Sequence, residues 1–372
     1  MYLKIAVLSG DGIGPEVILQ AKKALNAIGI VYDHQFVFEE ALVGAIAIDK
    51  TGNPLPEQTL NLCLNTDAVL FGAIGDPKYD NPDATVRPEQ GLLRLRQSLG
   101  LFANIRPIKP YKALLDSSPL KREVIEGADF IIYRELSGGV YRGIKETDET
   151  GTLATDSYEY SEKEISRITH LAFKAAQSRR KKVTVVDKAH VLETSRLWRK
   201  VVQKISEEYP DVTLNFLFVD NAAMQIIVNP RQFDIILTEN LFGDILSEEA
   251  SVIAGSIGLL ASTSLGKENA LFEPIHGSYP KAKGKNIANP IASILSAAML
   301  LDHFGLHIEA QNVYEAVEKA FEYKIVTTDL NSYSKFGTNE VGDFVSNYII
   351  NKDDVTLYFN NDNVHIGQST IV

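Results

Sequence analysis

The chain has 372 residues, a formal net charge of −11 and a single cysteine, Cys63. This length can bury a large core and predicts two lobes. The negative charge argues against nucleic acid as a partner, and one cysteine excludes an intramolecular disulfide framework and fits a reducing compartment. Without a recognisable signal peptide or a long apolar span, we expect a cytoplasmic protein with no membrane partner.

A glycine-rich turn lies near the N-terminus. An apolar strand is predicted over 4–8, the turn over 10–16 (Gly-Asp-Gly-Ile-Gly-Pro-Glu), and a helix over 17–28. This order invites comparison with a Rossmann fold, but the spacing is G-x-G-x-G rather than G-x-G-x-x-G. Glu16 would also place a negative charge where a pyrophosphate would bind. We therefore expect a tight turn near a ligand, and no Rossmann cradle.

Three arginines follow apolar segments in the first half of the chain. A helix predicted over 89–99 carries Arg96, Arg106 lies just beyond it, and a strand over 129–133 leads to Arg134. Each can be an ordinary surface arginine. However, unpaired cations beside apolar strands are costly, and converging guanidinium groups bind carboxylates bidentately. The sequence thus favours an anion site.

The middle of the chain predicts a β excursion and a candidate base. The polar region 138–160 reads as β structure outside the core, and a helix follows over 162–178. A buried strand over 182–187 then leads to Lys188. The end of a strand is a common functional position in open α/β sheets. The alternative for Lys188 is a structural salt bridge with its neighbour Asp187.

Carboxylates follow the next two predicted strands. Asp220 comes after the strand 213–219, and Asp244 and Glu248 come after the strand 233–237. Residues four apart share one face of a helix, and oxygen ligands suit Mg²⁺ or Mn²⁺. The alternative is a solvated acidic helix face. Because Asp220 and Asp244 both end strands and open helices, we expect them at adjacent strand ends, where a metal can bind.

A basic loop precedes the last predicted helices. Lys281, Lys283 and Lys285 stand among glycines and asparagines, a composition that suits a phosphate-bearing ligand. An apolar helix follows over 291–301, and the region from 312 onward reads as helices with a final polar segment. Strands alternate with helices throughout, so the predicted class is α/β.

Together these motifs resemble the isocitrate/isopropylmalate dehydrogenase family of β-decarboxylating dehydrogenases. The resemblance implies two α/β domains around a cleft and a fold that is not Rossmann. It implies one domain from 1–101 plus 256–372 and a second from 102–255, whose β arm near 138–160 enters the partner of a homodimer with shared active sites. The matching stretches occur in a fixed order over nearly the whole chain: 10–17, 87–106, 133–143, 186–192, 219–225, 240–251 and 273–290.

The resemblance also implies roles for individual residues. Tyr141 and Lys188 correspond to the catalytic acid–base pair, and Lys188 and Asp220 would come from the partner subunit. The metal ligands, for Mg²⁺ or Mn²⁺, are Asp220, Asp244 and Glu248. The substrate-binding residues are Arg96, Arg106, Arg134, Asp220, Leu92, Leu93 and Glu89. The cofactor-binding residues, within the stretch 75–89 and the loop 277–289 or close to them, are Gly75, Glu89, Glu273, His276, Gly277, Ser278, Lys281, Ala288 and Asn289.

The implied reaction is metal-dependent oxidative decarboxylation of 3-isopropylmalate to 4-methyl-2-oxopentanoate with NAD, in leucine biosynthesis. A neutral Lys188 amine would accept the hydroxyl proton, and Tyr141 would protonate the enol. Leu92, Leu93 and Val191 suit the isopropyl group, where an isocitrate enzyme needs polar side chains. Tartrate/malate or homoisocitrate dehydrogenases are the alternatives, since apolar contacts discriminate weakly. A non-enzymatic binding protein on this fold would have lost such residues as Tyr141 and Lys188.

Three positions depart from the pattern of the family. Glu248 stands where an aspartate is usual, which lengthens a metal ligand by one methylene. His190 replaces an asparagine near the nicotinamide, and we have no account of it. Lys281 replaces the aspartate of NAD-dependent members, and Ala282 follows it where NADP-dependent members have a tyrosine. We expect NAD as the cofactor, with NADP as the alternative.

Overall fold

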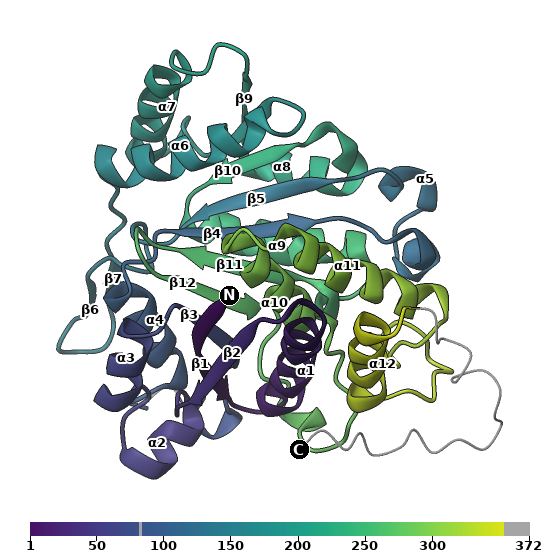
Figure 1. Cartoon of the computed structure of the whole chain (residues 1–372). Coiled ribbons are helices and arrows are strands. Elements are labelled where there is room, and N and C mark those ends of the chain that lie inside the picture. The colour runs from purple at the N-terminus through teal and green to yellow at the C-terminus, as the bar shows by residue number, and fades with distance from the viewer. Residues whose placement is uncertain (82–83, 353–372) are drawn as a thin grey trace. The chain divides into compact units, whose positions relative to one another are not determined.

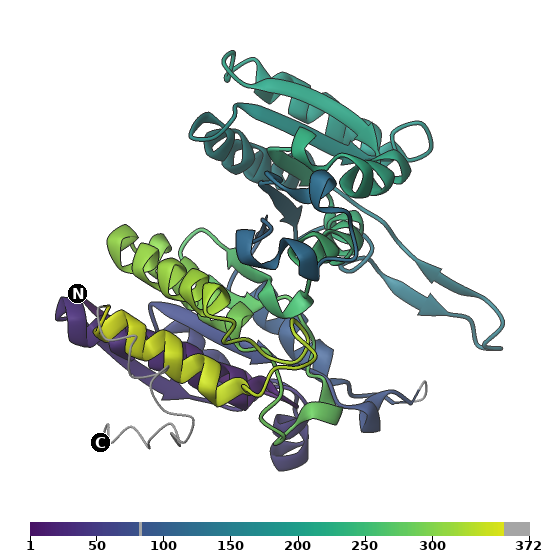
Figure 2. The same cartoon turned by 90° about the vertical axis from the view of Figure 1, so that its right-hand side faces the viewer.

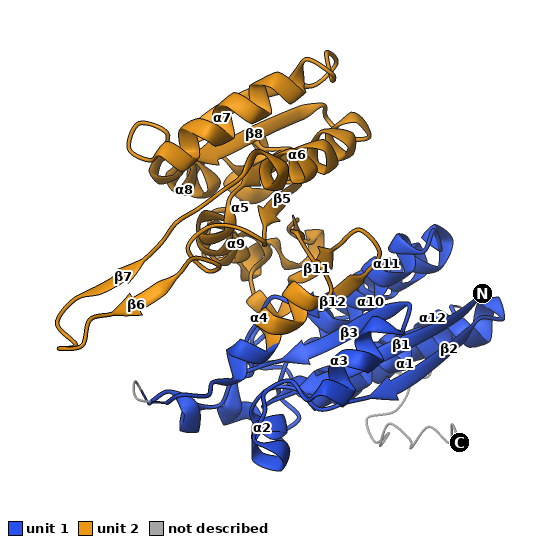
Figure 3. Ribbon diagram, turned by 90° about the vertical axis from the view of Figure 1, so that its left-hand side faces the viewer, with its two compact units in different colours: residues 1–91, 272–372 blue, residues 92–271 orange. Residues whose placement is uncertain are grey.

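The computed structural model describes residues 1–81 and 84–352, and the chain forms two compact units. Unit 1 combines residues 1–91 with those from 272 onward, and unit 2 is the continuous segment 92–271 (Figure 3). The domain limits expected from the family resemblance, after 101 and 255, differ from this division and stay a prediction. The expected polar tail lies outside the described residues from 353 onward, and so do residues 82–83 of the stretch 75–89.

Unit 1 contains a group of hydrogen-bonded strands with helices packed on it. Its strand order is β2-β1-β3-β12, and β1 pairs in parallel with both β2 and β3. Helix α1 packs against α10 and α12 (Figure 1). The strands are β1 (Tyr2–Gly10), β2 (Gln35–Glu40), β3 (Ala68–Ala73) and β12 (Ala270–Pro274); the helices are α1 (Gly14–Tyr32), α2 (Ala45–Thr51), α3 (Glu57–Leu64), α10 (Ile291–His303), α11 (His307–Glu322) and α12 (Thr338–Ile350), with the 3₁₀ turns η1 (Pro77–Tyr79) and η5 (Pro280–Ala282).

Unit 2 contains a mixed sheet in the order β11-β4-β5-β10-β8-β9. The pairs β11–β4 and β4–β5 are antiparallel, and β5–β10, β10–β8 and β8–β9 are parallel. The strands are β4 (Ala103–Ile108), β5 (Phe130–Glu135), β8 (Lys182–Asp187), β9 (Thr213–Phe218), β10 (Ile235–Thr238) and β11 (Ala261–Leu265). The helices are α5 (Arg122–Ile125), α6 (Glu162–Gln177), α7 (Glu193–Ser206), α8 (Val219–Val228) and α9 (Asn240–Ala254), with η2 (Lys112–Ser117), η3 (Pro230–Gln232) and η4 (Ile257–Leu259). Helix α4 (Pro88–Ser98) begins in unit 1 and ends in unit 2, whereas β12 begins in unit 2 and lies mostly in unit 1.

The core of unit 2 lies between its sheet and the paired helices α6 and α7. Phe173 and Trp198 from these helices pack with Val185 and Leu237 from the parallel strands, and all four side chains are buried. Helix α6 begins at a capping box in which Ser161 and Glu164 bond each other's backbone N–H groups. Such reciprocal bonds satisfy donors that a helix start leaves free.

The α/β prediction is confirmed, and the mixed strand order is not that of a Rossmann sheet.

A two-stranded arm extends from the body of unit 2 (Figures 2 and 3). Its strands, β6 (Lys145–Thr147) and β7 (Ala154–Asp156), are antiparallel, and every residue in them is exposed. This agrees with the β excursion predicted over 138–160. An isolated two-stranded hairpin is marginally stable in water, so the arm is a candidate for contact with another chain.

In the described part of the chain, no helix has the length and apolar character needed to cross a membrane.

Candidate active site

Arg134, in β5, is held against the start of helix α9. Its Nε and Nη2 donate to the Asn240 side-chain oxygen at 3.0 and 2.8 Å, and Nη1 pairs with Asp244. Gly243 permits this approach, because a Cβ there would lie 2.7 Å from the Arg134 Cγ. The guanidinium is therefore fixed by a helix whose sequence leaves room for it.

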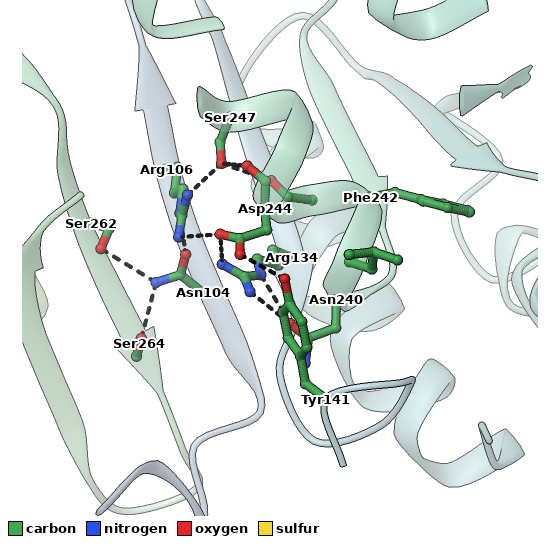
Figure 4. A network of polar contacts seen from close by, with 12 residues as sticks. Asn104, Arg106, Arg134, Tyr141, Asn240, Phe242, Asp244, Ser247, Ser262 and Ser264 are labelled. Carbon is green, nitrogen blue, oxygen red and sulfur yellow. Dashed lines mark hydrogen bonds and ion pairs between the residues drawn. The ribbon is translucent and has the colours of Figure 1, made fainter. Parts of the chain in front are cut away.

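Arg106, in the adjacent strand β4, reaches the same carboxylate. Its Nε donates to the Asn104 side-chain oxygen at 2.6 Å, Nη1 donates to Ser247, and Nη2 lies 3.4 Å from Asp244 Oδ1. The Asn104 amide in turn donates to two serines of β11, as Figure 4 shows. Arg106 and Arg134 are only 5% and 2% exposed, so their charges depend on these partners.

Tyr141 completes the cluster around Asp244. Its hydroxyl donates to Asp244 Oδ2 at 3.0 Å, and the Arg134 guanidinium lies 5.7 Å from the centre of its ring (Figure 4). Burial raises the pKa of Tyr141, and the Asp244 charge raises it further. Burial would also raise the pKa of Asp244, but Arg134 and Arg106 outweigh it and lower that pKa. The tyrosine is thus protonated and the aspartate ionised at neutral pH, as a proton donor and a cation ligand require.

The cluster carries more positive than negative charge. Arg96, on α4, is close enough to lower the pKa of both Arg134 and Asp244. Burial is the main cause that lowers the pKa of Arg134, and Arg106 contributes next. Three guanidinium groups around one ionised carboxylate leave a surplus of positive charge, which suits a substrate with more than one carboxylate.

Glu248 lies one helical turn beyond Asp244. Partial burial raises its pKa, Arg106 opposes that shift, and the nearby Asp244 adds to it. The structure therefore places two carboxylates on one helix face beside the arginines, as the spacing predicts. Within residues 1–81 and 84–352, however, no group of three or more His, Cys, Asp or Glu side chains is arranged to hold a metal ion.

Asp220 is not in this cluster, and the prediction of adjacent strand ends is wrong. Strand β8 lies between β10 and β9, so the segments that carry Asp244 and Asp220 are separated by a strand. Asp220 instead accepts a bond from Lys188 Nζ at 2.7 Å, which lowers its pKa. Asp244 also lies a full turn inside α9 rather than at its start.

Lys188 does not form the alternative salt bridge with Asp187. The Asp187 carboxylate is bound by Arg199, whose Nε lies 2.6 Å from Oδ2. The Lys188 amine, which follows β8, pairs with Asp220 instead, and the Asp220 side chain is 67% exposed. His190 lies close enough to Asp220 to lower its pKa, and its ring packs edge-on against Phe218. These residues form a second polar group in unit 2.

The glycine turn of unit 1 is filled by the protein's own backbone. A Cβ at Gly10, Gly12 or Gly14 would lie 2.0, 1.9 and 2.0 Å from the carbonyl oxygens of Ala73, Ser278 and Ser9, respectively. The glycines therefore allow chain segments to approach one another and leave no space for a phosphate. This bears out the rejection of a Rossmann cradle.

Comparisons with known proteins identify the family. The family model described as isocitrate/isopropylmalate dehydrogenase matches residues 4–345. A 3-isopropylmalate dehydrogenase of Bacteroides fragilis is 51% identical over 352 residues, covering 94% of this chain and 99% of that protein. One of Geobacillus kaustophilus is 52% identical over 334 residues, covering 88% and 90%. The crystal structure of isocitrate dehydrogenase from Methylococcus capsulatus has a TM-score of 0.85 at 33% identity, covering 94% of this chain and 99% of that one.

The chain belongs to the isocitrate/isopropylmalate dehydrogenase family. The predicted family is thereby confirmed, and with it the predicted fold. The roles that the family resemblance implied for single residues stay predictions, and the structure shows where those residues lie.

Three of the predicted cofactor residues meet at Gly75 in unit 1. Gly75 has a φ of +115°, a conformation that favours glycine, and a Cβ there would lie 3.1 Å from Glu89 Oε1 and 3.5 Å from Ser278 Oγ. These residues come from separate segments: the loop after β3, helix α4, and the loop after β12. The fold therefore joins the two stretches, 75–89 and 277–289, that the resemblance assigned to one cofactor.

His276 offers a nitrogen to a ligand. Its Nδ1 lies 3.0 Å from the Gly277 carbonyl oxygen, while its Nε2 is buried and has no hydrogen-bond partner among the described residues. Burial lowers the pKa of His276, so the ring is neutral. A Cβ at Gly277 would meet nothing within 4 Å. The open space is at Gly277, and the neighbouring buried nitrogen calls for a polar partner that the described residues do not supply.

The other predicted residues of this loop serve its packing or face solvent. Ala288 is buried in a small apolar cluster with Ile13. The Asn289 side-chain amide donates to Asp329, and its side-chain oxygen accepts the N–H of Ile291, the first residue of α10. Glu273 is buried in β12, and Lys281 is exposed in η5. Of the two leucines of α4, Leu92 is half-buried and Leu93 is 37% exposed.

Sequence reasoning missed the polar partners of the arginines. Asn104 precedes Arg106 by two residues in one strand, so both side chains leave the same face. Asn240 and Ser247 precede and follow Asp244 by four and three residues in one helix, which also puts them on its face. These spacings were a usable signal, although nothing in the sequence indicates which arginine each residue meets.

Proposed function

We propose that this chain catalyses the oxidative decarboxylation of 3-isopropylmalate to 4-methyl-2-oxopentanoate and CO₂ with reduction of NAD, a step of leucine biosynthesis. The observation that carries the proposal is the convergence of Arg134, Arg106 and Tyr141 on Asp244. Relatives about half identical in sequence, over most of the chain, are named 3-isopropylmalate dehydrogenase. The half-buried Leu92 and the partly exposed Leu93 offer apolar surface for the isopropyl group.

Each residue of the cluster has a chemical task in this proposal. Arg106, Arg134 and Arg96 bind the two carboxylates of the malate moiety and orient C2 and C3. Lys188 accepts the proton of the 2-hydroxyl, and the Tyr141 hydroxyl later donates a proton to the carbon that loses CO₂. A tyrosine whose pKa is raised by burial holds its proton until that step.

A divalent cation and a dinucleotide fit the residues present. Asp244 and Glu248 would hold Mg²⁺ or Mn²⁺ together with Asp220 of a second copy, since hard cations prefer carboxylate oxygens. Gly75, Glu89, Ser278 and His276 would hold the dinucleotide. When bound, the cation supplies Lewis-acid catalysis and the nicotinamide accepts the hydride.

The proposal includes a homodimer with shared active sites. Among the described residues of one chain, Lys188 binds Asp220 and forms no hydrogen bond or ion pair with Asp244, and a second copy would bring a Lys188 and an Asp220 of its own to the Asp244 cluster. Apolar side chains are exposed where a partner can cover them: Ile144 and Leu153 flank the arm strands, and Met224 and Ile245 lie on α8 and α9.

The direct test is an assay of purified protein with 3-isopropylmalate. We expect NADH formation that requires Mn²⁺ or Mg²⁺ and stops with a chelator, and little activity with malate, tartrate or homoisocitrate. Preference for a related hydroxy acid would change the proposed substrate. Equal or higher catalytic efficiency with NADP would assign the cofactor choice to Lys281, whose exposed amine can meet a 2′-phosphate.

Tyr160 supports the start of helix α9, which carries Asn240 and Asp244. The Tyr160 hydroxyl accepts the Asn240 N–H at 3.0 Å and lies 3.4 Å from Glu239 Oε2, while its ring lies against Gly138. We expect Tyr160→Phe to lower kcat by about 10–100-fold, the range for residues that orient functional groups. The control is Tyr209→Phe, which removes a hydroxyl that bonds His170 at 2.9 Å. Equal kcat in both variants would contradict this role.

A further inference from the structure

We propose that Asp11 and Glu16, the two acidic residues of the glycine turn, position the loops that form the dinucleotide site. The inference rests on the proposed function, and it extends that function to a motif outside the predicted site residues. It gives the turn a task other than phosphate binding, which its packed glycines exclude.

Asp11 joins two segments of unit 1 that are distant in sequence. Its carboxylate is 5% exposed and accepts three backbone N–H groups: Ala45 at 2.8 Å, Ile46 at 2.9 Å and Gly75 at 2.9 Å. The first two lie at the start of α2, and the third lies in the loop after β3. Gly44 allows this contact, since a Cβ there would lie 2.4 Å from Asp11 Oδ2. The carboxylate thus fixes the position of Gly75.

The fixed position of Gly75 matters because other predicted cofactor residues surround it. Glu89 Oε1 and Ser278 Oγ both lie within 3.5 Å of where its Cβ would be. The same turn also holds Ser278 directly, through a bond from Ile13 N to the Ser278 carbonyl oxygen at 2.8 Å. A displacement of the turn would therefore move both loops at once.

Glu16 fixes the loop 277–289 at a point beyond Ser278. Its carboxylate accepts the backbone N–H of Gly284, and that of Asn286 at 3.3 Å. These residues follow Lys281 and precede Ala288 in the loop assigned to the adenosine. Backbone N–H groups bound to a carboxylate form charge-assisted bonds that are stronger than neutral ones. The acidic residue in the first turn of α1 therefore binds protein N–H groups where a Rossmann protein binds phosphate.

The experiment replaces each carboxylate by its amide. Asp11→Asn and Glu16→Gln keep the size of the side chain but turn one acceptor atom into a donor that faces backbone donors. Asp67→Asn is the matched control, because Asp67 accepts a backbone bond from Lys4 N at 2.7 Å at an exposed position away from these loops. The affinity for NADH is measured by fluorescence titration, and steady-state kinetics give one Michaelis constant for NAD and another for the hydroxy acid.

We expect the dissociation constant for NADH and the Michaelis constant for NAD to rise by about 10–100-fold in Asp11→Asn and by about 3–10-fold in Glu16→Gln. The Michaelis constant for the hydroxy acid should stay within about twofold, because the three arginines proposed to bind its carboxylates are in unit 2. Asp67→Asn should match the wild type. A general loss of packing would instead change both Michaelis constants or the folded fraction.

The outcomes separate the two proposals. A wild-type affinity for NADH in both variants would overturn the positioning role while the assay of the unmodified enzyme still supports the proposed function. If Asp11→Asn does not fold, Glu16→Gln, which is partly exposed, decides the question. A wild-type protein that binds neither NADH nor NADPH would overturn the proposed function, and this inference with it.

Discussion

Replacing Tyr141 by phenylalanine should lower kcat by about 10²–10⁴-fold, the usual contribution of a positioned general acid. The hydroxyl is 3.0 Å from Asp244 Oδ2, and burial with the Asp244 charge raises its pKa, so it is a proton donor and not a base. Phenylalanine keeps the ring over Arg134 but has no proton to give. Substrate binding should therefore persist, because the arginines are untouched.

The measurement is the turnover rate with 3-isopropylmalate, together with the affinity for that substrate by calorimetry. Tyr348→Phe is a suitable control, since its hydroxyl lies 3.4 Å from Glu315 in unit 1 and has no proposed task in the reaction. A Tyr141→Phe variant that turns over at a near-normal rate would remove Tyr141 from the mechanism. A variant that no longer binds substrate would make Tyr141 a binding residue.

Asp244→Asn should reduce metal-dependent turnover by about 10³-fold, equivalent to about 4 kcal/mol of activation free energy. The substitution removes a charged ligand and leaves two buried guanidinium groups facing a neutral amide. The affinity for Mn²⁺ should weaken in parallel. It is measured by electron paramagnetic resonance, in which the signal of the free ion is lost as the ion binds. Glu249→Gln is the control on the same helix. Unchanged Mn²⁺ affinity in Asp244→Asn would exclude Asp244 as a ligand.

Asp244→Asn should also change the free energy of unfolding and the dependence of that free energy on pH. We expect the free energy of unfolding to fall by about 1–3 kcal/mol at neutral pH, the cost of removing an ionised partner from two buried guanidinium groups, reduced by partial solvent exposure. Arg134 and Arg106 lower the pKa of Asp244 in the folded protein. Its contribution is therefore present above the unfolded pKa of about 4 and is lost as the pH falls through the lower folded value. Denaturant unfolding at neutral and acidic pH measures this difference.

The sequence by itself determined the class of fold and pointed to the candidate residues of the site. The alternation of strands and helices predicted α/β, and the spacing of Asp244 and Glu248 put two carboxylates on one helix face, because helical periodicity is local. The glycine spacing and Glu16 correctly excluded a Rossmann cradle. Arg106 and Arg134 were found because arginines next to apolar strands need partners.

Only the tertiary structure decided which of these residues meet. Strand β8 separates β9 from β10, so Asp220 binds Lys188 rather than joining Asp244. The partners Asp244 and Asn240 of Arg106 and Arg134 likewise come from α9, more than a hundred residues away in the chain. Strand order and such contacts depend on pairing between distant segments, whose free energy is shared over many side chains. Local patterns name the candidate residues for the chemistry, and the long-range packing of strands and helices selects their neighbours.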